Sequence, residues 1–460
     1  MFDYAAYPAE ILRHAIDQPH LNPSYSPQRT PRAQGKNAGD FLASLGMGAA
    51  RGVDPALKAN LGATQEINRR GAQQLRHNVA MHHIKLLFLI AAILSLCCCW
   101  CFAQNSADPA AGRWSEEDAN DWYAHQPWLV GSDYIPANAI NELEMWQAES
   151  FDPKRIDLEL GWAQSLGMNT MRVFLHDLLW QQDAKGFTMR VDTFLSIADK
   201  HHIKILFVLF DSCWDPNPQL GPQRPPIPGV HNSGWMQSPG ATALSDASQY
   251  PRLKAYVQGV VGAFAKDTRI LAWDLWNEPD NMNGPPYRQR DPKNKVELVT
   301  ALLPQVFTWA RSTDPVQPLT SGVWEGDYSS PEELNPMQRV QLEQSDVISF
   351  HSYEWPEDFE KHVEWLERYH RPIICTEFMA RPVGSTFDAI LPIAKKHHVG
   401  AINWGLVVGK TQTNLPWESW EHPYVFQPPP VWFHEVFYPD GKPYREREAA
   451  ILRELTGTQP

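Results

Sequence analysis

Eight short apolar segments recur between Trp128 and Leu406, and stretches of helical length separate them. The segments are rich in Val, Ile, Leu and Phe, and their starts are 26 to 66 residues apart. Parallel strands need crossover connections of this length, which usually contain a helix. The pattern therefore predicts an α/β fold, a (β/α)8 (TIM) barrel that occupies residues 128–460 and ends in a closing helix from about Arg445. The predicted strands are 128–134, 170–175, 204–210, 270–276, 319–323, 347–353, 373–377 and 401–406.

The first hundred residues differ from the rest. An uncharged apolar run spans residues 86–103, and it follows the basic residue Lys85 and the methionine Met81. This composition predicts a signal peptide or signal anchor at residues 81–103 and export of the part that follows, to the periplasm or the cell exterior. Residues 1–80 are then either an upstream extension, disordered or left by a wrongly assigned start, or a cytosolic tail before an anchor. A lipid anchor on Cys97 is the weaker alternative, because Leu96 stands where a small residue should precede it. Residues 104–127 are interpreted as a lead-in to the barrel.

The composition excludes some function classes. With 40 basic and 53 acidic side chains the formal net charge is -13, and no cluster of five Lys or Arg residues occurs, which argues against nucleic acid as a partner. The 19 Trp residues suit contacts with sugar rings, although Trp also fills large cores. Outside the apolar run only Cys213 and Cys375 remain, so one disulfide is possible, and the oligomeric state stays open.

A proline-rich segment, residues 211–240, follows the third predicted strand and cannot be a regular helix or strand. Loops after the strands of a βα barrel lie at the carboxyl end of the barrel, where active sites form. Trp214, His231 and Trp235 in this segment are therefore candidate substrate contacts. The loop could extend a groove for polymers or close one end of the site.

Two predicted strands end in a glutamate. Residues 270–279 read ILAWDLWNEP and end the fourth strand near Glu278, and residues 373–379 read IICTEFM and end the seventh strand at Glu377. The sequence contains no G-x-S-x-G, H-E-x-x-H or G-x-G-x-x-G motif. Cleavage of a glycosidic bond requires two carboxyl groups, one as acid and one as nucleophile or base. A pair of strand-end glutamates therefore favours glycoside hydrolysis.

At these residues the chain resembles the retaining glycoside hydrolases with (β/α)8 barrels, and most closely glycoside hydrolase family 5, the cellulase family. The resemblance implies that Glu278 is the general acid/base, that Glu377 is the nucleophile, and that neither metal nor cofactor takes part. It further implies that Asn277 donates to the sugar 2-hydroxyl, that His351 in SFHSY contacts the substrate, and that Tyr353 in the same segment bonds the nucleophile. Arg172 in the segment NTMRVF, counted with the substrate-binding residues, would hold the nucleophile and keep its pKa low. Trp404 in AINWG would form the floor of the cleavage subsite.

One departure concerns the third strand, where family members commonly carry a His and this chain reads Asp211-Ser-Cys-Trp-Asp. The departure puts the substrate subclass in doubt. We expect a β-linked, β-1,4 plant-type polysaccharide or its oligomers as substrate, with endo or exo action open. The alternatives are an exported carbohydrate-binding barrel without turnover, and an envelope-anchored glycosidase that acts on the cell's own glycans.

Overall fold

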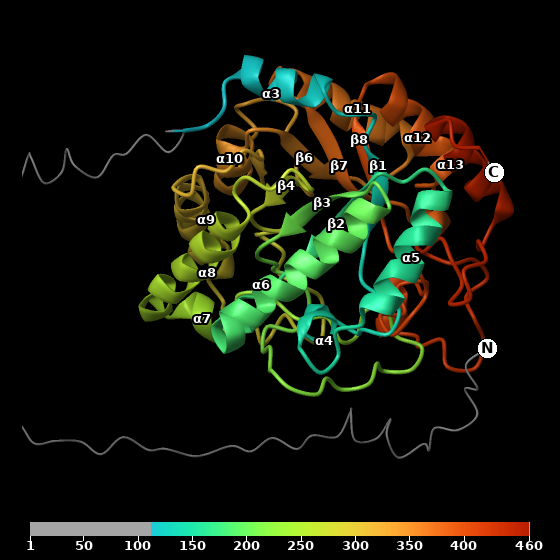
Figure 1. Cartoon of the computed structure of the whole chain (residues 1–460), viewed down its shortest axis with the longest axis horizontal. Helices are drawn as coiled ribbons and strands as arrows, with labels where there is room; N and C mark the ends of the chain where they lie inside the picture. The colour runs from blue at the N-terminus through green and yellow to red at the C-terminus, as the bar shows by residue number, and fades with distance from the viewer. Residues whose placement is uncertain (1–111, 460) are drawn as a thin grey trace, which may run out of the picture. The chain divides into compact units, whose positions relative to one another are not determined.

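The computed structural model describes residues 112–459 (Figure 1). The expectations for residues 1–80 and 81–103, and for most of the lead-in before Gly112, lie outside this range. Among the described residues, no helix has the length and apolar character needed to cross a membrane.

Eight parallel strands form one sheet in the order β5-β4-β3-β2-β1-β8-β7-β6. A parallel bridge between Val323 and Phe350 joins the β5 and β6 ends and closes the barrel. The (β/α)8 barrel predicted from the sequence is therefore confirmed. Every strand except β7 is shorter than predicted, and β8 also begins one residue earlier. The strands are β1 (Val130–Asp133), β2 (Thr170–Phe174), β3 (Lys204–Val208), β4 (Ile270–Asp274), β5 (Leu319–Thr320), β6 (Ile348–His351), β7 (Ile373–Phe378) and β8 (Gly400–Trp404).

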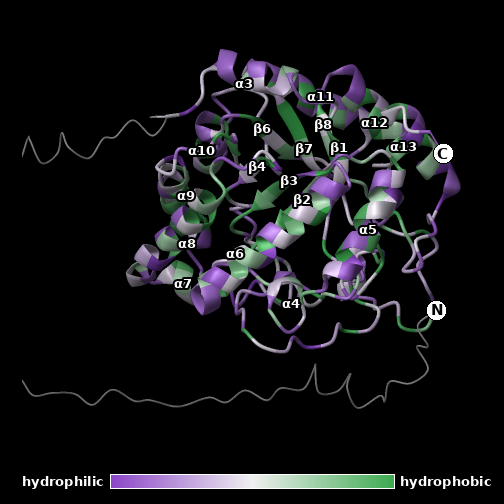
Figure 2. Cartoon of the chain, viewed as in Figure 1, coloured by the Kyte–Doolittle hydropathy of each residue, from purple (hydrophilic) through white to green (hydrophobic). Residues whose placement is uncertain are grey.

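Helices surround the strands, with polar residues on their outer faces (Figures 1 and 2). Their ends follow local sequence signals: Asp152 caps α5 and Pro153 occupies its first turn, and a capping box of Asn335 and Gln338 begins α10. The closing helix predicted from about Arg445 is present as the last element. The helices are α3 (Glu116–Ala124), α4 (Glu142–Trp146), α5 (Pro153–Ser165), α6 (Asp177–Lys200), α7 (Ala241–Ser245), α8 (Tyr250–Ala263), α9 (Lys295–Arg311), α10 (Pro336–Gln344), α11 (Pro356–Glu367), α12 (Phe387–Lys396) and α13 (Glu446–Thr456).

The inside of the barrel is layered along its axis. At the amino ends of the strands lies an apolar layer that includes Leu129, Val347 and Ile374, and Trp122 and Tyr123 of α3 pack against it. The part of the lead-in that the structure describes therefore covers one end of the barrel. Because alternate residues of a strand point inward, Arg172 lies above this layer and binds two interior carboxylates. The opposite end of the barrel, at the carboxyl ends of the strands, is left for a functional site.

Candidate active site

A cavity of about 300 Å³ lies at the carboxyl ends of the strands. Its lining includes seven of the nine site residues predicted from the sequence. These are Trp214, Trp235, Asn277, Glu278, Tyr353, Glu377 and Trp404. Residues that lie up to 190 positions apart in the chain therefore meet in one site, as expected from their places at strand ends and in the loop after β3.

Glu377 on β7 accepts hydrogen bonds from two fixed donors. The guanidinium of Arg172 donates to its Oε1 at 2.8 Å, and the hydroxyl of Tyr353 donates to its Oε2 at 2.7 Å. Arg172 is completely buried, and its other N–H groups bind Asp133, Asp274 and the Oδ1 atom of Asn277. One cation thus orients the Glu377 carboxyl and balances the negative charge of Asp133 and Asp274.

Glu278 follows β4, and among the described residues no Lys or Arg is its direct partner. Its Oε2 accepts hydrogen bonds from the amide of Asn281 at 2.6 Å and from the thiol of Cys213 at 3.1 Å. Burial raises the pKa of the Glu278 carboxyl, and these two hydrogen bonds oppose that rise. The backbone of Glu278 has φ +41°, a left-handed conformation that costs a non-glycine residue roughly 1–3 kcal/mol. Such strain persists where the surrounding structure holds a side chain in a required place.

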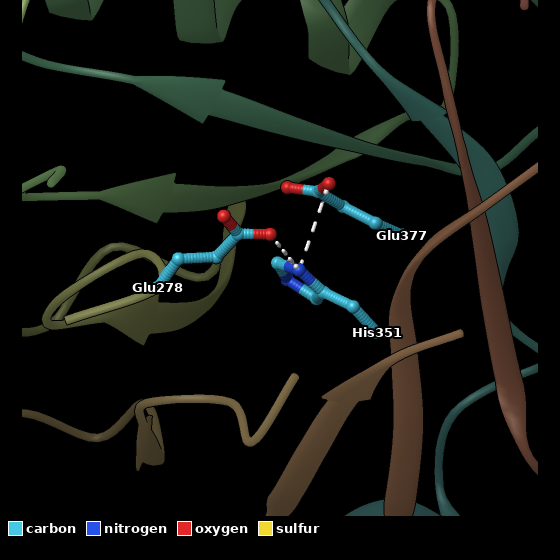
Figure 3. A group of neighbouring side chains, drawn as sticks. All are labelled: Glu278, His351 and Glu377. Carbon is cyan, nitrogen blue, oxygen red and sulfur yellow. Dashed lines mark hydrogen bonds and ion pairs between the residues drawn. The ribbon is translucent and has the colours of Figure 1, made fainter. Parts of the chain in front are cut away.

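His351 lies between the two glutamates (Figure 3). Its Nδ1 atom is 3.0 Å from Oε1 of Glu278 and 3.6 Å from Oε2 of Glu377. One atom from each of the three side chains lies within 4.8 Å of the others, and the described residues contain no other group of His, Cys, Asp and Glu that could hold a metal ion. Burial lowers the pKa of His351 to about 4, so the ring is neutral near neutral pH.

Asp211 occupies the end of β3, where the family commonly has a His. Its carboxyl accepts hydrogen bonds from the side chains of Asn277 at 2.9 Å and Trp235 at 2.6 Å. The amide of Asn277 is therefore held at both ends, with its oxygen on Arg172 and one N–H on Asp211. Its second N–H faces the sulfur of Cys213 at 3.5 Å. The departure seen in the sequence thus changes the support of Asn277 and leaves it on the cavity wall.

The structure corrects three expectations. Arg172 does not contact the cavity, so it supports Glu377 and cannot touch a sugar. His351 is likewise absent from the cavity lining and contacts the glutamates instead. We also expected Arg172 to keep the pKa of Glu377 low, whereas burial raises this pKa and outweighs the opposing effects of His351, Arg172 and Tyr353.

The two cysteines left open in the sequence are both buried, and within the described residues they form no disulfide with each other. Burial raises the pKa of the Cys213 thiol, which therefore remains protonated and can donate to Glu278. Cys375 lies on β7 and donates to the backbone carbonyl of Glu377 at 3.2 Å.

Sequence reasoning missed part of the cavity wall. Trp417 and His434 come from the segment after β8, and Asn281 and Asn283 come from the loop after β4. The aromatic residues at 417, 420, 432 and 433 were a signal for the first segment, because exposed Trp residues after a barrel strand favour ligand contact. The asparagines had no signal, since Asn is common in any loop.

Comparisons with known proteins agree with this geometry. The family model described as "Cellulase (glycosyl hydrolase family 5)" matches residues 163–408, which is more than half of the chain. Among curated proteins, none matches the chain significantly.

Two solved structures of a family 5, subfamily 18 protein from Streptomyces cattleya are similar in fold. The complex with GlcNAc has a TM-score of 0.51 at 14% identity and covers 72% of this chain and 81% of that protein. A variant in complex with Manβ1-4GlcNAc has a TM-score of 0.50 at 12% identity, with 72% and 80% covered. At this identity the likeness concerns the fold, while the family model covers the strands that carry both glutamates. The chain belongs to glycosyl hydrolase family 5, the cellulase family, and is a β-glycoside hydrolase.

Proposed function

We propose that this protein is a retaining β-glycosidase in which Glu377 is the nucleophile and Glu278 the general acid/base. One observation carries the proposal: the two glutamates face each other across the cavity, with one oxygen of each within 4.8 Å of the other. Retaining enzymes need a short separation of about 5–5.5 Å between the carboxyl groups, whereas inverting enzymes leave about 6.5–9.5 Å for a water molecule.

The surroundings of the two carboxyl groups assign the roles. Burial raises the pKa of both carboxyl groups, and two carboxyl groups this close titrate as a pair, so one proton is retained more strongly than the other. Arg172 and Tyr353 donate directly to Glu377 and favour its ionised form. The more strongly held proton therefore resides mainly on Glu278, whose partners are an amide, a thiol and the neutral ring of His351. An ionised Glu377 can attack, and a protonated Glu278 can donate.

The reaction then has two steps. Glu377 attacks the anomeric carbon, the bond to the leaving oxygen breaks, and the proton of Glu278 passes to that oxygen. Glu278 next takes a proton from water, the water oxygen attacks the anomeric carbon, and Glu377 is released. Each step inverts the anomeric centre, so the overall reaction retains its configuration. Asn277 lies on the cavity wall next to Glu278 in the chain, where its amide can contact the sugar 2-hydroxyl.

For the substrate we propose a β-linked sugar chain, with β-1,4 linkage as the first choice. Trp404, Trp417 and Trp214 supply aromatic faces in the cavity lining, and such faces stack on sugar rings. Manβ1-4GlcNAc, the ligand of one similar structure, belongs in the first panel together with oligomers of xylan, mannan and β-glucan.

The test combines stereochemistry with labelling. Early NMR spectra of the hydrolysis products should contain the β-anomer first, and a 2-deoxy-2-fluoro glycoside with a good leaving group should label Glu377 as a covalent adduct that peptide mass spectrometry locates. An α-anomer as the first product, or a label on another residue, would refute the proposed roles. If no sugar is hydrolysed and none labels the protein, turnover itself is refuted. The alternative, a carbohydrate-binding barrel without turnover, would then be favoured.

We also propose that the catalytic barrel is exported, on the basis of the apolar run at residues 86–103 and its basic lead. Fractionation of cells that express the full chain tests this. A shortened soluble form outside the cytoplasm indicates a cleaved signal, and a full-length membrane form indicates an anchor and favours action on envelope glycans. Full-length protein in the cytoplasm would contradict export.

A further inference from the structure

One side of the cavity is closed by two segments that meet above the barrel. They are the loop after β3 and the segment after β8, although β2 and β1 separate these strands in the sheet. Backbone and side-chain hydrogen bonds tie them together at many points. The donors and acceptors are Asn232 N to Thr411 O at 2.7 Å, Gln412 Nε2 to Ile227 O at 2.7 Å, Tyr424 N to Gly229 O at 2.8 Å and His231 N to Ser419 Oγ at 2.9 Å.

An aromatic wall lies where these segments face the cavity. Trp214 from the first segment stacks on Trp420 from the second, with ring centroids 5.5 Å apart and planes 18° apart. Tyr287 from the loop after β4 packs edge-on against Trp420 at 5.4 Å. The backbone N–H of Trp214 donates to Asn283 at 2.6 Å. Trp214 is therefore held by contacts with two other loops, and a sugar chain cannot pass through this side without breaking these contacts.

Two buried histidines in the cavity lining, His231 and His434, make the same kind of hydrogen bond. Nδ1 of His231 contacts the carbonyl of Leu415 at 2.7 Å, and Nδ1 of His434 contacts the carbonyl of Met379. A carbonyl only accepts, so each Nδ1 carries the proton and each Nε2 of the neutral ring has a free lone pair. Within the part of the chain that the structure describes, neither Nε2 has a hydrogen-bond partner, and neither is among the fully enclosed polar atoms.

Both histidine rings are also uncharged near neutral pH. Burial lowers the pKa of His231 to about 4, and burial together with His231 lowers the pKa of His434 well below its usual range. The two ring centroids are 5.5 Å apart, so adjacent hydroxyl groups of one sugar can reach both. Among the described residues, the cavity lining includes no Lys or Arg. Hydroxyl groups that donate hydrogen bonds fit this wall, and carboxylated sugars do not.

We propose that this closed side of the cavity holds the terminal, uncharged sugar of a β-linked chain, and that His231 and His434 accept hydrogen bonds from its hydroxyl groups. The enzyme then removes units from the chain end. This inference rests on the proposed function, because the terminal unit must lie beside Glu278 and Glu377. The cavity of about 300 Å³ is at the lower end of the ~300–1,000 Å³ usual for small-ligand sites, which suits one end of a chain and not a long groove.

The first experiment follows oligosaccharides labelled at the reducing end. The full chain should release one small sugar from the unlabelled end of a labelled pentamer at each cleavage and leave the label on the longer product. A pentamer whose terminal unit is blocked by O-methylation should not be cleaved. Internal cleavage of the labelled pentamer, or equal cleavage of the blocked form, would overturn the inference while leaving the retaining mechanism intact. Loss of all hydrolysis together with loss of the Glu377 label would instead remove the proposed function.

The second experiment separates recognition from support. In His231→Asn and His434→Asn the amide can replace Nδ1 as donor to the carbonyl, but the acceptor at Nε2 is lost. In the matched His→Gln variants the amide oxygen can replace Nε2, while the bond to the carbonyl is lost. We expect the Asn variants to keep the melting temperature and to lose about tenfold or more in kcat/KM, mainly through KM. The Gln variants should keep more of kcat/KM and melt earlier.

Deoxygenated substrates connect the histidines to individual hydroxyl groups. Removal of one hydroxyl from the terminal sugar should lower kcat/KM for the wild-type enzyme, and the same removal should cost little in the matching His→Asn variant. The inference fails if the loss in kcat/KM from the His→Asn substitution and the loss from removal of a hydroxyl multiply for every hydroxyl. It also fails if the Asn variants act at wild-type rates, because the histidines would then not bind the sugar.

Discussion

The two glutamates of the site are almost equally enclosed but differently held. Their side chains are 6% exposed for Glu377 and 11% for Glu278. Glu377 is held by Arg172 on β2 and by Tyr353, two residues after the end of β6. Glu278 is held by the loop residues Cys213 and Asn281, and His351 contacts both glutamates. We call the first set the β7 side and the second the β4 side.

Under the proposed retaining mechanism, the difference shows how one site separates two chemical tasks. Burial raises the pKa of both carboxyl groups, so burial alone cannot make one an acid and the other a nucleophile. The partners do so: a cation and a phenol on the β7 side favour the ionised form, and weaker neutral donors on the β4 side leave the proton in place. Each of the following predictions alters one side and leaves the other intact.

The largest effect is expected for Glu377→Ala. Without the nucleophile, kcat for an aryl β-glycoside should fall at least about 10⁴-fold. Azide can enter the vacated space and attack directly, so added azide should restore turnover and yield the α-glycosyl azide. Rates of product formation and NMR of the azide product check this, with the exposed Glu354→Ala as a control that should keep wild-type rates. A β-glycosyl azide would contradict the assignment of the two roles.

Glu278→Ala should have a smaller effect that depends on the leaving group. The acid contributes about 10²–10⁴-fold where the departing oxygen needs a proton. A dinitrophenyl glycoside needs little protonation and should lose less than an alkyl glycoside. Here azide attacks the covalent intermediate, so the expected product is the β-glycosyl azide. Equal losses for both leaving groups would mean that Glu278 is not the acid.

Arg172→Met tests the β7 side through stability. The substitution leaves Glu377, Asp133 and Asp274 without their shared cation in a buried layer, which should lower the free energy of unfolding by about 3–5 kcal/mol. Urea denaturation measures the change. The matched control is Arg339→Met, because the Arg339–Glu343 pair is exposed and should contribute less than ~1 kcal/mol. Similar losses in both variants would show that the buried network adds nothing special.

The β7 side could be predicted from the sequence, and the β4 side only in part. Arg172, Tyr353 and Glu377 stand in or beside apolar strands, where period-two alternation and the parallel order determine which side chains meet. The contacts of Cys213 and Asn281 depend on how two long loops pack, and no periodicity encodes that. For the same reason the sequence did not predict His434 as a cavity residue, because it lies in a segment of irregular structure 30 residues after β8.

The direction of the Glu377 pKa was wrong in the sequence prediction for a physical reason. An adjacent arginine indicates a lowered pKa only if the carboxyl group keeps some water. The sequence shows the arginine but not the depth of the site, and here the removal of water is the largest contribution.

The smallest expected effect concerns the β4 side and the pH dependence of the rate. The thiol of Cys213 donates to the ionised form of Glu278 and thereby lowers its pKa. Cys213→Ala removes this donor, so the pKa of Glu278 should rise and the acid should stay protonated to higher pH. The alkaline limb of the kcat/KM profile, which reports the free enzyme, should then move to higher pH, while kcat at the optimum changes less than about tenfold. Cys213→Ser keeps a donor of similar size and should leave the limb near its wild-type position. A shift to lower pH in the Ala variant, or equal shifts in both, would mean that the loop after β3 influences Glu278 through its shape and not through this hydrogen bond.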